Sequence, residues 1–144
     1  MKLLLCYTKD EIQKLLYRDS IFKEICWAES EILPDTWDSD FDNYAYFKIL
    51  NENEAVLGLW ILRSLGNDQF NVHMGLFKEF RGIATPQLVQ NCLALSKEHQ
   101  PGCYWTLVSE ENLACQKMLL KAGFKELGCI PNAIRGIINA KIYG

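Results

Sequence analysis

The amino-acid sequence predicts an α/β fold with a mixed β-sheet, in a single domain spanning residues 1–144, and three observations support this. First, the 144 residues are 49% hydrophobic and 23% charged, which suits one soluble domain with one core. Second, three β-rich runs follow one another between residues 44 and 77, which favours antiparallel pairing. Third, strand and helix patterns then alternate, which favours a parallel pair of strands joined by a helix.

The N-terminal part is expected to form a strand followed by helices. Lys2–Tyr7 is an apolar run typical of a short strand. Thr8 is a candidate helix cap because a glutamate follows three residues later, and apolar residues then recur at helical spacing up to Arg18. A second helix is predicted to begin at Ser20 and to end before Pro34.

The middle of the chain is expected to form three antiparallel strands. Tyr44–Leu50 and Ala55–Leu62 are β-rich runs, and the polar residues between them predict a hairpin turn. Phe70–Phe77 is the third run, and its side chains alternate between two faces of the sheet. One face carries Val72, Met74 and Leu76, and the other carries Asn71, His73 and Gly75.

A strand, helix, strand, helix pattern completes the expected fold. Thr85 is a candidate cap and Pro86 suits the first helical position, so a helix is predicted from there to just before the next proline. Cys103–Val108 is a near-continuous apolar run, as expected of a strand buried on both faces. The next helix is predicted to begin near Asn112 and to end at Gly123. The tail predicts a closing pair of strands, at Phe124–Ile130 and Ile134–Tyr143.

The net charge of −3 is unevenly distributed along the chain. Residues 1–72 carry 7 Lys or Arg against 13 Asp or Glu, whereas residues 73–144 carry 8 against 5, so an anionic ligand is expected at the second half. No concentrated basic patch occurs, so nucleic acid is not an expected partner. No apolar run reaches the roughly 18 residues of a membrane span, and no signal peptide is evident, so the predicted location is cytoplasmic and no membrane partner is expected.

Neither the cysteines nor the acidic residues form a complete metal motif. The 6 cysteines are spread one to an element with no CxxC pair, so they are expected to be reduced and mostly buried. Asp38, Asp40 and Asp42 lie at alternate positions. However, Asn43 and Ile49 stand where a calcium-binding EF-hand needs glycine and glutamate. No metal cofactor is therefore predicted.

The turn between the third β-rich run and the following helix is the best candidate for a binding site. A helix N-terminus offers free backbone N–H groups and the positive end of the helix dipole, and both favour a phosphate. Gly82 lets the backbone approach a ligand closely, and Arg81 adds positive charge. The sequence therefore indicates an anionic ligand at this turn.

Two motifs and the order of the elements together point to a known fold. The first motif is Arg81-Gly82-Ile83-Ala84-Thr85, and the second runs from Asn112 to Lys121-Ala122-Gly123-Phe124. With the expected order β-α-α-β-β-β-α-β-α-β-β, the chain resembles the GNAT superfamily of N-acetyltransferases over essentially its whole length. The resemblance implies a central splayed mixed sheet flanked by helices. The stretch from His73 to Arg81 looks most like short, partly degenerate members encoded by bacteriophages.

This resemblance implies an N-acyltransferase that uses acetyl-CoA as co-substrate. The acceptor would be a primary amine of a small molecule or a protein, and the acidic segment at residues 35–42 would attract a cationic one. Asn112 matches the family's asparagine near the pantetheine arm, and the backbone at Leu76 would hold the thioester carbonyl. The family's pyrophosphate loop corresponds to Arg81, Gly82, Ile83, Ala84 and Thr85.

Three side chains are candidates for the base that deprotonates the amine. His73 lies on the third β-rich run, and an imidazole has an ordinary pKa of about 6.5. A partly buried histidine with satisfied hydrogen bonds is the structural alternative for this residue. Glu110 and Glu111, just after the apolar run at Cys103–Val108, are the other candidate bases, unless they are solvated loop residues.

Three residues depart from the family pattern and support a second hypothesis. In one alignment Glu79 occupies a position where the family has Gln or Arg; in the other, Arg81-Gly82 is the family's first Arg-Gly and two loop residues are missing. Pro86 lacks an N–H group for an anion. Leu119 stands where many members place the tyrosine that protonates the leaving thiolate. The alternative is a catalytically inactive GNAT-fold bacteriophage protein that acts in head or virion assembly or as a binding factor. The sequence also leaves a homodimer open.

Overall fold

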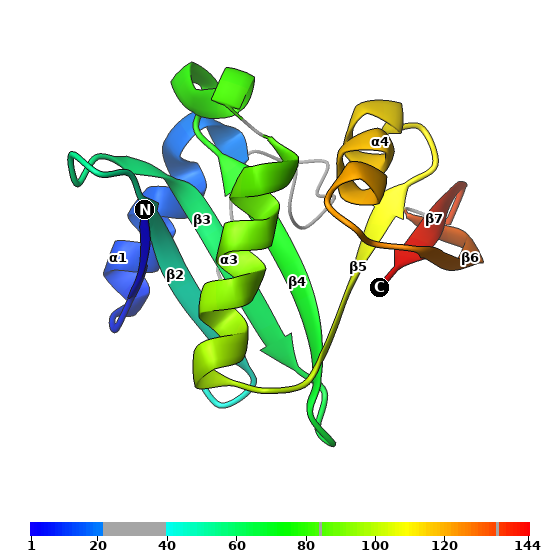
Figure 1. The fold of residues 1–144 in the computed structure, drawn as a ribbon, viewed down its shortest axis with the longest axis horizontal. Helices are drawn as coiled ribbons and strands as arrows, with labels where there is room; N and C mark the ends of the chain where they lie inside the picture. Colours follow the sequence, from blue (N-terminus) through cyan, green and yellow to red (C-terminus); the bar gives the residue numbers. More distant parts are fainter. Residues whose placement is uncertain (22–39, 84, 135) are drawn as a thin grey trace. The chain divides into compact units, whose positions relative to one another are not determined.

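The computed structural model describes residues 1–21, 40–83, 85–134 and 136–144, which form one mixed sheet flanked by helices (Figure 1). The strands are β1 (Lys2–Leu5), β2 (Tyr44–Leu50), β3 (Val56–Ser64), β4 (Gln69–Leu76), β5 (Cys103–Ser109), β6 (Glu126–Ile134) and β7 (Ile138–Tyr143). Their order in the sheet is β1-β2-β3-β4-β5-β7-β6. This confirms the predicted fold class.

The helices are α1 (Lys9–Tyr17), α3 (Pro86–His99) and α4 (Leu113–Lys121), with two short 3₁₀ helices, η1 (Arg18–Ser20) and η2 (Lys78–Ile83). The helix predicted from Ser20 and the acidic residues before Asp40 fall mainly outside the described residues. By its internal contacts the chain divides into two units. Unit 1 comprises Met1–Ser64 and Val72–Ile83, and unit 2 comprises Leu65–Asn71 and Ala84–Gly144.

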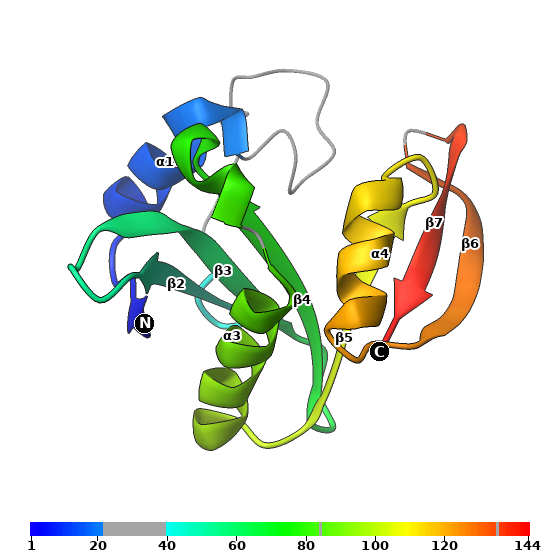
Figure 2. The same cartoon turned by 45° about the horizontal axis from the view of Figure 1, so that its top comes forward.

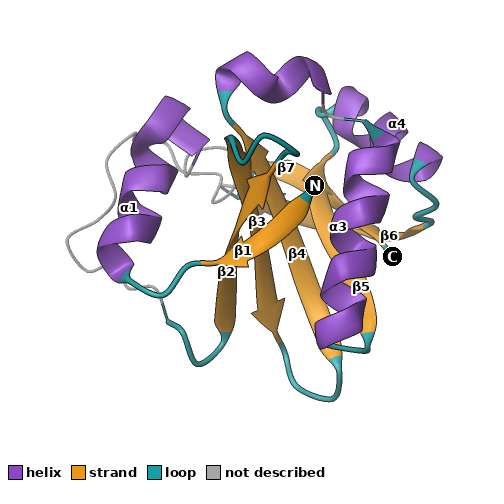
Figure 3. Ribbon diagram, turned by 60° about the vertical axis from the view of Figure 1, so that its left-hand side comes forward, coloured by secondary structure: helices purple, strands orange, loops and turns teal. Residues whose placement is uncertain are grey.

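In unit 1, α1 begins and ends where the sequence predicts. The Thr8 side chain accepts a hydrogen bond of 3.2 Å from the Glu11 N–H, which confirms the predicted cap. Ile12 and Leu16 of α1 belong to a buried core that also contains Tyr46 of β2; Figure 3 shows α1 and β2 in the fold. Burial of these side chains, rather than helix propensity alone, stabilises so short a helix. The other buried members of this core are Cys6, Ile21, Leu59, Ile61 and Phe77.

Strands β2 and β3 form the predicted antiparallel hairpin, and β4 follows β3 in the sheet. The register pairs Tyr44 with Arg63 and Ile49 with Gly58. A Cβ atom placed on Gly58 would lie 2.0 Å from the carbonyl oxygen of Gly75 in β4. The backbones of β3 and β4 therefore approach so closely here that only glycine fits at position 58.

In unit 2, β4 and β5 run parallel and are joined by α3, as the sequence predicts. The register pairs Gln69 with Cys103 and Asn71 with Trp105. The rings of Phe70 and Tyr104 stack with their centroids 5.0 Å apart. A parallel pair needs a long crossover connection, and the 14-residue helix α3 supplies it.

The predicted closing pair of strands is present, with different bounds. The sequence predicts that Ile134 lies in the last strand, but it is the last residue of β6. The reason is that Ile134 pairs with Ile138 across the turn. β7 pairs with both β6 and β5, so the last strand inserts between the two. Figure 2 shows α4 lying beside β5 in unit 2.

Candidate functional site

In unit 1, the end of β4 brings two of the predicted site residues together. Leu76 is buried, and its carbonyl oxygen accepts a hydrogen bond of 3.3 Å from Nε of Arg81. Arg81 itself is exposed to solvent. The Arg81 side chain therefore turns back to the strand end, and the Leu76 carbonyl is already engaged.

The residues of the predicted glycine-containing turn after β4 wind into η2. The first turn is closed by a hydrogen bond of 2.9 Å from the Phe80 N–H to the Phe77 carbonyl. None of the η2 side chains is buried. The winding uses backbone groups that an open loop would leave for a ligand. Ala84, which belongs to the predicted pyrophosphate loop, lies outside the described residues.

Three contacts with Arg18 and Asp19 of η1 hold the start of η2. The Asp19 carboxylate accepts a hydrogen bond of 2.8 Å from the Lys78 N–H at the beginning of η2. Arg18 forms an ion pair with Glu79 and also lies over the Phe77 ring, with Cζ 3.8 Å from the ring centroid. Glu79, which departs from the family pattern, is therefore engaged within the protein.

Gly82 is the predicted residue that best fits a ligand approaching the backbone. A Cβ atom at Gly82 would meet no atom within 4 Å, so packing inside the described protein does not require glycine there. Its neighbour Ile83 is 45% exposed. The space beside the Gly82 backbone is therefore open.

In unit 2, the N-terminus of α3 has a side-chain cap that leaves few donors for an anion. Thr85 Oγ1 accepts from the Leu88 N–H at 3.2 Å, and the Thr85 carbonyl accepts from the Val89 N–H at 3.3 Å. Pro86 at the first helical position has no N–H to offer. Of the first-turn donors, the Gln87 N–H is the one that the Thr85 cap does not use.

His73 lies in the unit 1 part of β4 and is half-buried. Burial, reinforced by the positive charge of Arg63, lowers the pKa of His73 to about 4. The ordinary value of about 6.5 expected from sequence is therefore wrong for this site. His73 is neutral at pH 7 and can accept a proton, but so low a pKa makes it a weak base.

The two candidate glutamates lie in the turn between β5 and α4, in unit 2. Both are exposed, and Asn112 follows them as the cap of α4, with its side chain accepting from the Cys115 N–H at 3.1 Å. The Glu111 N–H donates to Ser109 Oγ at 3.2 Å. The structure therefore places three predicted site residues, Glu110, Glu111 and Asn112, on one turn.

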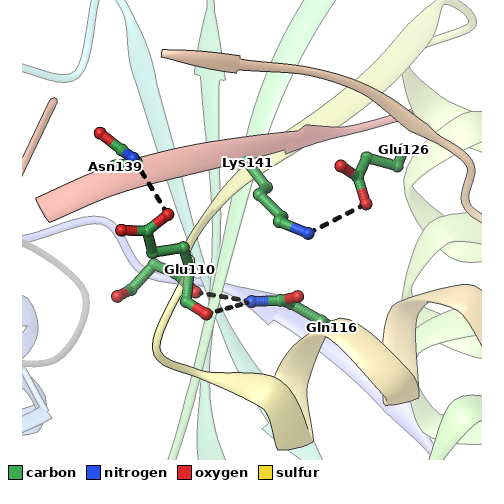
Figure 4. Close-up of polar contacts among 6 residues, drawn as sticks. Glu110, Gln116, Glu126, Asn139 and Lys141 are labelled. Atoms are coloured by element: carbon green, nitrogen blue, oxygen red, sulfur yellow. Dashed lines mark hydrogen bonds and ion pairs between the residues drawn. The ribbon is translucent and has the colours of Figure 1, made fainter. Parts of the chain in front are cut away.

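Two further polar residues at this turn are absent from the sequence prediction. Gln116 is only 7% exposed, and its Nε2 donates to the carbonyls of Ser109 and Glu110 at 3.0 and 2.9 Å (Figure 4). Asn139 of β7 donates from Nδ2 to Glu110 Oε2 at 3.0 Å. The sequence does contain a signal for Gln116, because it is a polar residue within the apolar face of the helix α4. Asn139 has no local signal, because β7 is distant in sequence.

The position that many family members give to a tyrosine is apolar and closed in this protein. Leu119 is 5% exposed, one turn along α4 from Cys115. Burial raises the pKa of the half-buried Cys115 thiol above its ordinary value. Neither side chain offers a ready proton to a leaving thiolate.

The described residues hold no group of three or more His, Cys, Asp or Glu side chains arranged for a metal ion. None of the described helices has the length and hydropathy to cross a membrane. Of the cysteines in the described ranges, Cys6 and Cys92 are buried, whereas Cys103 and Cys129 are exposed. The expectation of mostly buried cysteines is therefore only partly correct.

Three solved structures show what fold this is. The spermidine N-acetyltransferase of Vibrio cholerae, solved with CoA and spermine, matches with a TM-score of 0.75 and 16% identity, over 98% of this chain and 93% of that one. A candidate acetyltransferase from Acinetobacter baylyi matches with a TM-score of 0.74 and 19% identity, over 99% and 90%. The ribosomal-protein-S5-alanine acetyltransferase of Vibrio fischeri matches with a TM-score of 0.59 and 16% identity, over 71% and 61%.

No protein-family model matches the sequence, and no curated protein matches it. At identities of 16 to 19%, the structural comparisons establish the fold and not the activity. The element order, the parallel β4–β5 pair and the long shared coverage agree with one another. The chain therefore has the GNAT acetyltransferase fold.

Proposed function

We propose that the chain is an acetyl-CoA-dependent N-acyltransferase that acts on a primary amine of a small molecule or a protein. The observation that carries the proposal is the fold likeness, over 98% of the chain, to an N-acetyltransferase solved with CoA and spermine. A single domain and a cytoplasmic location are part of the proposal.

The residues present fit acetyl-CoA in part. Lys78 and Arg81 are exposed cations on η2, and the open space at Gly82 is what a phosphate approaching the backbone needs. Taken by itself, unit 2 has the Gln87 N–H at the start of α3, which the Thr85 cap does not use. Leu76 would contribute its backbone, and Asn112 its position at the start of α4.

Acetyl-CoA supplies an acyl thioester, and the chain's own residues handle the proton of the acceptor. An amine attacks a thioester carbonyl only in its neutral form, so the ammonium form must first lose a proton. His73, Glu110 and Glu111 are the candidates for that acceptor. With Leu119 buried in place of a tyrosine, the leaving thiolate would take its proton from water.

Acetyl-CoA calorimetry on Gly82→Ala tests the donor half of this proposal. A methyl group there is free of internal clashes, so folding should be unaffected, whereas a ligand close to the backbone would be pushed away. We expect the wild-type protein to bind acetyl-CoA and to acetylate at least one of spermine and a lysine-containing peptide. We expect Gly82→Ala to weaken acetyl-CoA binding about tenfold, a cost of about 1.4 kcal/mol.

Gly128→Ala on β6 is the matched control, because a Cβ there would have one ordinary contact, 3.9 Å from Ile142 Cδ1. It should bind acetyl-CoA as tightly as the wild type. Absence of wild-type binding at millimolar acetyl-CoA would contradict the proposal.

That negative result would favour the second candidate, a catalytically inactive GNAT-fold bacteriophage protein in head or virion assembly or acting as a binding factor. Two observations favour this candidate: the exposed Glu79 carboxylate is paired with Arg18 of the same chain, and Leu119 leaves no proton donor at its position. A homodimer would be compatible with either candidate.

A further inference from the structure

Glu110 and Glu111 are neighbours in sequence, but the structure treats their carboxylates differently. Asn139 Nδ2 donates to Glu110 Oε2 at 3.0 Å (Figure 4). The Glu110 N–H donates back to the Asn139 carbonyl at 3.0 Å. Among the described residues, the Glu111 carboxylate has no hydrogen-bond partner, and its N–H is held by Ser109. Only Glu110 is therefore held both through its backbone and through its carboxylate.

The Asn139 amide is oriented from its other end as well. Its Oδ1 accepts a hydrogen bond of 2.9 Å from the N–H of Asn132. Asn132 has a positive φ of 53° and lies in the irregular part of β6, between Ile130 and Ile134. Because the oxygen end of the amide is used by this N–H, its NH₂ end faces Glu110. The irregular part of β6 thus orients the Asn139 side chain so that its NH₂ group donates to Glu110.

Gln116, which lies in α4, holds the backbone of the same turn. Its buried Nε2 donates both hydrogens, to the carbonyls of Ser109 and Glu110 at 3.0 and 2.9 Å. A buried amide is costly unless it is fully hydrogen-bonded, so these two contacts hold the turn firmly. The Asn112 N–H adds a third contact, to the Ser109 carbonyl at 3.0 Å.

The Glu110 carboxylate is oriented without being neutralised. Its donor, Asn139, carries no charge, and within the described ranges Glu110 forms no ion pair. Glu126 on the same sheet is different, since Lys141 Nζ lies 3.3 Å from its Oε2 (Figure 4). A positioned, exposed carboxylate without an ion-pair partner among the described residues suits a cationic ligand.

We propose that Glu110 is the carboxylate that receives the acceptor's ammonium group, and that Asn139 and Gln116 are positioning residues for it. This inference rests on the proposed function. The ammonium transfers one proton to the carboxylate, which leaves a neutral amine and a carboxylic acid. The amine nitrogen then forms the C–N bond as the thioester C–S bond breaks. The carboxylic acid and the acylated nitrogen each release a proton to water, and the thiolate takes one back.

A double-mutant cycle tests this inference, with acetyl-CoA as donor and spermine or a lysine-containing peptide as acceptor. We expect Glu110→Gln to lower kcat/KM by about 10²-fold, as for other positioned acid–base groups. Asn139→Ala should lower kcat/KM about tenfold, because the carboxylate loses its orientation. In the double variant the loss should equal that of Glu110→Gln alone, since Asn139 acts only through Glu110.

Three further variants separate positioning from general structural damage. Asn139→Gln keeps an amide donor and should recover part of the activity. Gln116→Met keeps the side-chain volume without the donor and should lower kcat/KM less than Glu110→Gln does. Glu126→Gln, which removes a carboxylate already paired with lysine, should leave kcat/KM unchanged. Thermal unfolding of each variant identifies any loss that comes from misfolding.

Additive losses in the double variant would overturn the inference, and so would a larger loss from Glu111→Gln than from Glu110→Gln. Calorimetry separates this failure from failure of the proposed function. Wild-type protein that acetylates spermine or the peptide, with a Glu110→Gln variant that is equally active, overturns the Glu110 inference and leaves the proposed function intact. Wild-type protein that binds no acetyl-CoA overturns both.

Discussion

At the scale of single residues, His73 shows how a strand position changes the chemistry of a side chain. The residue is half-buried in β4, where loss of water and the charge of Arg63 both disfavour the imidazolium form. With its pKa lowered to about 4, His73 stays neutral over the whole range in which most enzymes work. A rate profile governed by this group would fall only near pH 4, and not near pH 6.5.

The same shift predicts how stability depends on pH. Between pH 6.5 and 4 the unfolded chain binds a proton at His73 that the folded chain does not, so the free energy of unfolding should fall as the pH falls through this window. The loss should be at most about 3 kcal/mol, reduced by the residue's partial exposure to solvent. Urea unfolding of the wild type and His73→Gln at pH 4 to 7 measures the difference.

His73→Gln should lose the part of the wild-type pH dependence that lies between pH 6.5 and 4. Equal slopes for the wild type and His73→Gln would show that burial does not hold His73 neutral.

At the scale of elements, the close approach of β3 and β4 depends on one glycine. We predict that Gly58→Ala destabilises the protein by about 3 kcal/mol or more, because its Cβ would lie 2.0 Å from Gly75 O and 2.8 Å from Leu76 Cα. These are backbone atoms that cannot rotate away. Denaturant unfolding measures the cost, and Gly128→Ala in β6 should change stability by less than about 1 kcal/mol. A mild effect of Gly58→Ala would mean that the strands separate readily.

The 3₁₀ helix η2 shows how distant contacts shape a predicted loop. Arg18 and Asp19, at the end of the first helical segment, bind Glu79 and the Lys78 N–H. At the other end, Nε of Arg81 donates a hydrogen bond to the Leu76 carbonyl. The segment predicted to favour a phosphate is therefore held at both ends by contacts within the protein.

At the scale of the whole molecule, β4 is the element that the two units share. Gln69–Asn71 belong to unit 2 and pair with β5, whereas Val72–Leu76 belong to unit 1. Local opening of one unit should therefore disturb a strand on which the other depends. This is the physical basis for proposing a single domain.

Hydrogen exchange tests this proposal. We predict that the most protected amides of β2 and β3 in unit 1 and of β5 and β7 in unit 2 open with free energies that agree within about 1 kcal/mol. Gly58→Ala should lower both values together, although it lies in unit 1. If only the unit 1 amides lost protection in this variant, the two units would be separate domains.

Sequence alone determined the features that depend on neighbouring residues. The caps predicted at Thr8 and Thr85 are present, since a cap is a contact across three residues, and a helix begins directly after Asn112 as predicted. The apolar patterns predicted the strands and the parallel β4–β5 pair, since alternation and crossover rules depend on chain order. The motifs at Arg81 and Asn112 are also short runs of neighbouring residues, and they pointed to a resemblance to the GNAT fold.

Only the tertiary structure decided the features that join distant residues. Ile134 ends β6 because it pairs with Ile138, and β7 inserts next to β5, which no local pattern encodes. The pKa of His73 depends on burial and on Arg63. Above all, the two equivalent glutamates of the sequence became unequal when folding placed Asn139 beside Glu110. A hydrogen bond between strands far apart in sequence depends on sheet order and register, and these are set by the packing of the whole chain.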